Sequence, residues 1–74
     1  MTPLEIIDAA IATNKERAAK AREALDKDEA TWTLGTTARY GLHAIIERCE
    51  TENVGFEVIW ARIAGAPRAT ETPR

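Results

Sequence analysis

The sequence predicts an all-α protein made of two long antiparallel helices, a helical hairpin, that completes a four-helix bundle by homodimerisation. Apolar residues recur at alternating steps of three and four in two segments, a capping motif opens the first segment, and a glycine followed by a proline closes the second. We expect helices over residues 3–30 and 37–64 within a domain of residues 1–66. Residues 67–74 are polar and contain proline, which predicts a flexible tail.

The first helix should begin at a capping box, the T-x-x-E pattern of Thr2 and Glu5. The hydroxyl can accept a hydrogen bond from the first turn, the carboxylate can reach back to the N-cap backbone, and Pro3 lies where its missing N–H costs nothing. One polar residue, Asn14, interrupts the apolar stripe of this helix. The stripe consists of Leu4, Ile7, Ile11, Ala18, Ala21 and Leu25.

The second helix should follow a turn at Gly35, with one of the next two threonines as its N-cap. It should end near Ala64, because the next residue is a glycine suited to a left-handed cap and a proline follows two positions later. Glu52 interrupts its apolar stripe. The stripe consists of Ala38, Leu42, Ile45, Cys49, Phe56, Ile59 and Ile63.

Asn14 and Glu52, the polar residues that interrupt the two apolar stripes, should contact each other. In an antiparallel hairpin about this turn, residues whose numbers sum to about 67 lie at the same level, and the apolar lists then match layer by layer. Asn14 falls opposite Glu52, so its amide can donate to the carboxylate. A polar layer of this kind costs stability and sets the register. The alternative is that Glu52 extends from an open seam into water.

One edge of the hairpin combines small and basic residues. An interior glycine weakens a helix by about 1 kcal/mol relative to alanine, so Gly41 and Gly55 indicate a place where another backbone approaches closely. The alternative is a local break in the helix over residues 53–55. The edge carries Ala10, Arg17 and Ala24 from the first helix, with Gly41, Arg48, Gly55 and Arg62 from the second.

The opposite edge places Ile46 and Trp60 among charged residues. A two-helix hairpin has no second layer to cover them, so we expect a partner there, most simply a second copy related by two-fold symmetry. The alternative is that Trp60 folds over Ile7 within its own hairpin.

Composition narrows the class of protein. Ten lysines and arginines stand against twelve aspartates and glutamates, so the formal net charge is −2 and gives little attraction to nucleic acid or acidic membranes. Cys49 is the single cysteine, which excludes an intrachain disulfide and CxxC motifs. No window approaches the ~18 consecutive apolar residues of a membrane span. We therefore expect a cytoplasmic protein that does not contact membranes.

Catalytic chemistry has little support. His43, Glu47 and Glu50 share one side of the second helix and could in principle bind a metal, although a solvated charged face is the simpler interpretation. His43 and Cys49 are six positions apart, on different faces, so they do not form a catalytic pair within the helix. We expect neither enzymatic activity nor a cofactor.

The sequence therefore favours a small protein–protein interaction module, an accessory, inhibitor or assembly component, whose partners are a second copy and an unidentified protein. The alternative is a dimeric regulator that binds RNA or DNA through the edge of Arg17, Arg48 and Arg62 and through basic residues of the first helix. Interleaved acidic residues weaken this alternative, because they form i,i+4 pairs with the lysines. The basic residues are Lys15, Arg17, Lys20, Arg22 and Lys27.

Overall fold

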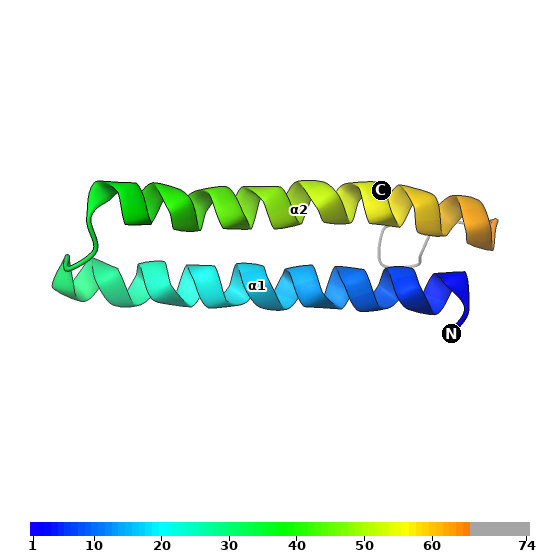
Figure 1. Ribbon diagram of the computed structural model, residues 1–74, viewed down its shortest axis with the longest axis horizontal. Helices are drawn as coiled ribbons and strands as arrows, with labels where there is room; N and C mark the ends of the chain where they lie inside the picture. Colours follow the sequence, from blue (N-terminus) through cyan, green and yellow to red (C-terminus); the bar gives the residue numbers. More distant parts are fainter. Residues whose placement is uncertain (66–74) are drawn as a thin grey trace, which may run out of the picture.

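The protein is an all-α hairpin of two helices that lie side by side and antiparallel (Figure 1). The computed structural model describes residues 1–65, with α1 over Pro3–Thr31 and α2 over Thr36–Ala64. The predicted helices are confirmed, and each inner end extends one residue further than expected. The predicted tail, residues 67–74, lies outside the described residues.

The outer ends of both helices carry the predicted caps. The Glu5 amide donates to Thr2 Oγ1 at 3.2 Å, and the Thr2 amide donates to Glu5 Oε1 at 2.7 Å. The hydrogen bond from the Thr2 backbone is the main reason that the pKa of Glu5 is lowered. At the end of α2, Gly65 has φ 81° and donates its amide to the Ala61 carbonyl at 2.9 Å.

The turn differs from the prediction. Trp32, not a glycine, adopts the left-handed conformation with φ 50° and caps α1 through its amide to the Asp28 carbonyl. Gly35 is extended and is itself the N-cap of α2, with no side-chain cap, so neither of the next two threonines has the predicted role. The left-handed conformation is costly for a bulky residue, and contacts around it must compensate for that cost.

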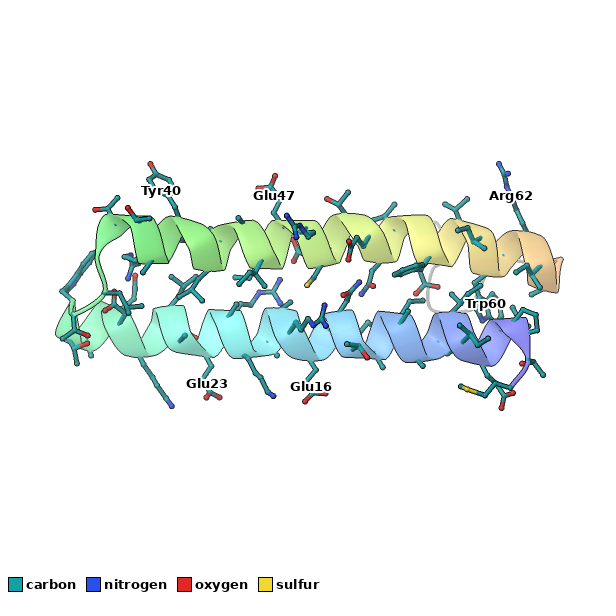
Figure 2. All side chains as sticks on the ribbon, viewed as in Figure 1. Glu16, Glu23, Tyr40, Glu47, Trp60 and Arg62 are labelled. Carbon is teal, nitrogen blue, oxygen red and sulfur yellow. The ribbon has the colours of Figure 1, made fainter. Side chains whose placement is uncertain are left out.

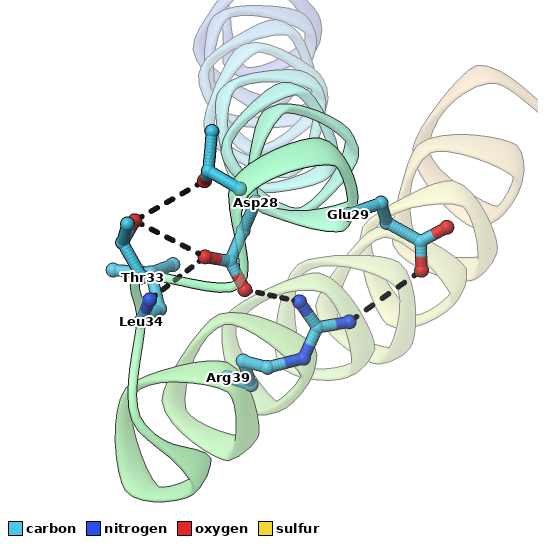
Figure 3. A network of polar contacts seen from close by, with 6 residues as sticks. Asp28, Glu29, Thr33, Leu34 and Arg39 are labelled. Atoms are coloured by element: carbon cyan, nitrogen blue, oxygen red, sulfur yellow. Dashed lines mark hydrogen bonds and ion pairs between the residues drawn. The ribbon is translucent and has the colours of Figure 1, made fainter.

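Asp28 supplies those contacts (Figure 3). Its carboxylate is buried and accepts hydrogen bonds from the Leu34 amide at 2.7 Å and the Thr33 hydroxyl at 3.4 Å. It also forms an ion pair with Arg39, whose guanidinium lies 4.6 Å from the Trp32 ring centroid. One side chain of α1 thus holds the turn and the first turns of α2, an arrangement that we call the Asp28 clamp.

The core comes mainly from α1. Its buried apolar residues are Ile11, Ala18, Ala21 and Leu25, and α2 adds Cys49. This set is narrow and contains no aromatic side chain, as expected for a hairpin that has a single layer on each side of its seam.

The seam of α2 is confirmed at Leu42, Cys49 and Phe56, whereas at the positions between them the inward residue is one place further along the chain than predicted. Ala38, expected at the start of this stripe, is exposed. The inward side of α2 carries Leu42, Ile46, Cys49, Asn53, Phe56 and Trp60, all buried or half-buried. Ile45, Ile59 and Ile63 were expected inside, and that expectation is wrong, because they remain 43%, 47% and 51% exposed. α2 is continuous through residues 53–55, so Gly55 does not mark a break.

Candidate protein-binding face

Asn14 is the centre of a polar layer that links the helices. It is buried, and its Nδ2 donates to Glu52 Oε1 at 3.2 Å and to Asn53 Oδ1 at 3.1 Å. Asn53 Nδ2 in turn donates to the Ile11 carbonyl at 3.3 Å. The hydrogen bond predicted between Asn14 and Glu52 is therefore present, with Asn53 as a third member that the stripe pattern did not predict.

The two acceptors on α2 face different surroundings. Asn53 is half-buried beside Asn14, whereas Glu52 is exposed. A carboxylate is far more costly to bury than an amide, so the amide occupies the inner position and the charge stays in water. Glu52 thus combines both interpretations of the sequence: it contacts Asn14 and also extends towards solvent. Its role in setting the register stays a prediction.

We expect the inner amide pair to carry most of the energetic coupling in this layer. Asn14→Leu should destabilise the hairpin by about 1 kcal/mol, because Asn53 loses a partner while half-buried. A double-mutant cycle measured by urea unfolding should give Asn14 and Asn53 a coupling of at least ~0.5 kcal/mol. The matched cycle of Asn14 with Glu52 should give less, because water replaces the lost donor at an exposed carboxylate. Strict additivity in the first cycle would contradict this account.

Beside the layer, α2 presents an open row of side chains that we call the Ile/Gly stripe. Every member is exposed. A Cβ atom added to Gly41 or Gly55 would meet no heavy atom within 4 Å, so nothing inside the hairpin requires these glycines. The stripe consists of Gly41, Ile45, Arg48, Glu52, Gly55 and Ile59.

A groove runs along the boundary between this stripe and α1. Arg17 and Lys20 line it from α1, and Arg48, Glu52 and Ile45 line it from α2. The small and basic edge predicted from the sequence thus brings Arg17 and Arg48 to one groove. Arg62 points away from α1 at the outer end of the hairpin (Figure 2).

The opposite edge is more closed than predicted. Ile46 and Trp60 are half-buried within a single hairpin, and Figure 2 shows Trp60 between the two helices. Ion pairs lie along this edge: Arg22 pairs with Glu50, and Arg39 pairs with Asp28 and, at 3.6 Å, with Glu29. The hairpin itself covers much of Ile46 and Trp60, so they are weaker candidates for a partner contact than the exposed isoleucines.

The basic stripe of α1 is largely paired with carboxylates. Lys20 lies 3.4 Å from Glu16, and Lys27 lies 3.4 Å from Glu23, both as i,i+4 pairs on the solvent side. Figure 2 shows Glu16 and Glu23 pointing away from α2. Pairs of this kind stabilise a solvated helix and reduce the positive potential available to a phosphate backbone.

The described residues offer neither a metal site nor a membrane-spanning helix. Among residues 1–65, no group of three or more His, Cys, Asp and Glu side chains could hold a metal ion, so His43, Glu47 and Glu50 do not converge. Over the same residues, neither helix has the length and apolar content needed to cross a bilayer.

Comparisons of the chain with protein-family models, with curated proteins and with solved structures found no match.

Proposed function

We propose that this chain is a non-enzymatic protein–protein interaction module, an accessory, inhibitor or assembly component, that acts as a self-associating hairpin. The observation that carries the proposal is the exposure of Ile45, Ile59 and Ile63 along one side of α2. Isolated exposed apolar residues are common, but a row of them beside a groove is typical of an interaction surface. A cytoplasmic location remains part of the proposal.

A second copy is the simplest partner for this surface. The hairpin has one narrow core, and a four-helix bundle would give it a second buried layer. Two-fold symmetry supplies the same exposed row on the partner, so no other surface has to be invoked. An unidentified protein that offers an apolar helix could bind the same row, either as a third component or in place of the second copy.

Size-exclusion chromatography with light scattering at micromolar concentration should give a mass near twice the 8.2 kDa of the chain. Ile59→Arg should shift the protein towards monomer with its helicity retained, because it places a charge in the proposed contact. Trp60→Arg is the matched comparison one residue away. It should mainly lower the thermal stability, because Trp60 is half-buried in its own hairpin. A wild-type chain that is monomeric and cooperatively folded would contradict self-association.

Binding of RNA or DNA is the second candidate, because Arg17, Lys20 and Arg48 line one groove. The two candidates differ in how strongly they respond to salt: phosphate binding weakens steeply as salt is added, whereas association through apolar side chains changes much less. A salt-sensitive gel shift that disappears when Arg17 and Arg48 are both replaced by alanine would favour the nucleic-acid candidate.

A further inference from the structure

We infer that the second copy docks antiparallel on the Ile/Gly stripe, with the two-fold axis beside residue 50 of α2. In this register Arg48 of each protomer pairs with Glu52 of the partner subunit. The inference rests on the proposed self-association and goes beyond it, since it names the contact surface and the register of the two chains.

The residues of the Ile/Gly stripe are spaced symmetrically about residue 50 of α2. They follow one another at steps of four, three, four, three and four, a pattern that is the same in both directions along the helix. When two copies run antiparallel about residue 50, residues whose numbers sum to 100 face each other. Gly41 then faces Ile59 of the partner subunit, Ile45 faces Gly55 of the partner subunit, and Arg48 faces Glu52 of the partner subunit. Large residues oppose small ones, and each cation opposes an anion.

The isoleucines and glycines of the stripe are accessible to a second copy. Ile45 and Ile59 are 43% and 47% exposed, so each presents apolar area to a partner. The space above both glycines is empty out to 4 Å, which leaves room for an isoleucine and for close approach of two helix backbones. Residues of the required size are therefore accessible at the required positions.

The charged pair at the centre is also available. Among residues 1–65, Arg48 forms no ion pair, in contrast to Lys20, Arg22, Lys27 and Arg39. Arg48 and Glu52 are i,i+4 neighbours in the less favourable order for a helical pair. The Asn14 hydrogen bond engages Oε1 of Glu52 and orients the carboxylate, whose Oε2 can accept from an arginine.

Other registers lose this complementarity. Parallel pairing would place Arg48 beside Arg48 of the partner subunit, where the like charges repel. It would also place glycine beside glycine, which leaves a gap between the helices. Sliding the antiparallel copy by one turn, so that facing numbers sum to about 104, would put Glu52 against Glu52 of the partner subunit. Only the register about residue 50 matches both size and charge along the whole stripe.

A charge exchange between two chains tests the register. Arg48→Glu alone, or Glu52→Arg alone, replaces both symmetric ion pairs with like-charge contacts, so each should raise the dimer dissociation constant by about tenfold or more at low salt. Mixing the two single variants should restore association to about the wild-type value. In the mixed dimer, the two glutamates of one chain face the two arginines of the other. Sedimentation equilibrium measures all four samples.

The matched control is Glu47→Arg, which makes the same charge change at an exposed position that points away from α1 (Figure 2). It should leave the dissociation constant within about twofold of wild type. If the wild-type chain never dimerises, the proposed self-association fails. If it dimerises but the stripe variants weaken it no more than the control, or if the mixture stays monomeric, the dimer stands and the register is overturned. Restored association in the mixture also shows that both variants are folded.

Discussion

Replacing Asp28 with alanine should lower the thermal midpoint of the hairpin by about 10 °C, the largest stability loss that we expect from any single charged residue. The carboxylate accepts hydrogen bonds from the Leu34 amide and the Thr33 hydroxyl, and it pairs with Arg39. Its removal leaves the Leu34 amide without that acceptor and separates Arg39 from its buried partner. Thermal unfolding followed by circular dichroism at fixed protein concentration measures the shift.

Glu29→Ala is the matched control for this prediction. Glu29 is the next residue and also contacts Arg39, at 3.6 Å, but its side chain is 65% exposed. Exposed ion pairs contribute little, so this variant should unfold within about 2 °C of the wild-type chain. Equal losses for the two variants would show that the turn is not held by the buried carboxylate.

The Asp28 clamp also gives stability a dependence on acid. The hydrogen bond from the Leu34 backbone is the main reason that the pKa of Asp28 is lowered, and Arg39 acts in the same direction. A folded-state pKa below the unfolded value means that the stabilisation is complete above the unfolded pKa and is lost as pH falls through the folded one. Stability should therefore fall below about pH 4, and Asp28→Asn should flatten that fall. Glu5, whose pKa is also lowered, contributes with the same sign.

Local signals predicted most of the fold. The capping box and the Gly65 cap depend on residues close in the chain and are present as expected, and the apolar spacing predicted both helices, although not the whole inward side of α2. The turn could not be predicted in the same way. A left-handed Trp32 contradicts ordinary backbone preferences, and it is supported by Asp28 and Arg39, which are 11 positions apart and meet only after the chain reverses.

The inward side of α2 was harder to predict because the sequence offers two adjacent rows. Ile45 and Ile46 are both apolar, Glu52 and Asn53 are both polar, and Ile59 and Trp60 are both apolar. Periodicity cannot choose between rows one residue apart. Hydrogen bonding favours the inner row: Asn53 can both accept from Asn14 and donate to the Ile11 carbonyl, whereas an ionised Glu52 can only accept.

That ambiguity also limited what the sequence revealed of the candidate face. The sequence indicates that Gly41, Arg48 and Gly55 form an unusual edge, but its apolar spacing predicts Ile45 and Ile59 in the seam. With the isoleucines in the core, this edge has no large apolar residue, and the sequence predicts the partner contact at Ile46 and Trp60. Because Ile46 and Trp60 lie inside in their place, Ile45 and Ile59 join the glycine edge, and the residues of that edge then alternate in size and in charge.

Replacing Gly55 with leucine should have opposite effects on the hairpin and on the dimer. Leucine is a better helix former than glycine by up to about 1 kcal/mol, and a Cβ at this position meets nothing within 4 Å, so the isolated hairpin should become more stable. In the proposed register the new side chain collides with Ile45 of the partner subunit, and the dissociation constant should rise by about tenfold or more. Unfolding at low concentration and sedimentation equilibrium measure the two effects separately.

Ala19→Leu provides the control, because it enlarges another small, exposed helical residue that lies outside the groove and the Ile/Gly stripe. It should leave the dissociation constant within about twofold of wild type. Combining Gly55→Leu with Ile45→Ala should recover part of the lost affinity, since two-fold symmetry places the smaller side chain against the larger one at both contacts. At this open position, only a neighbouring chain can make added bulk unfavourable. If the Gly55→Leu chain is more stable and still dimerises like the wild type, then Gly55 does not lie in the dimer contact.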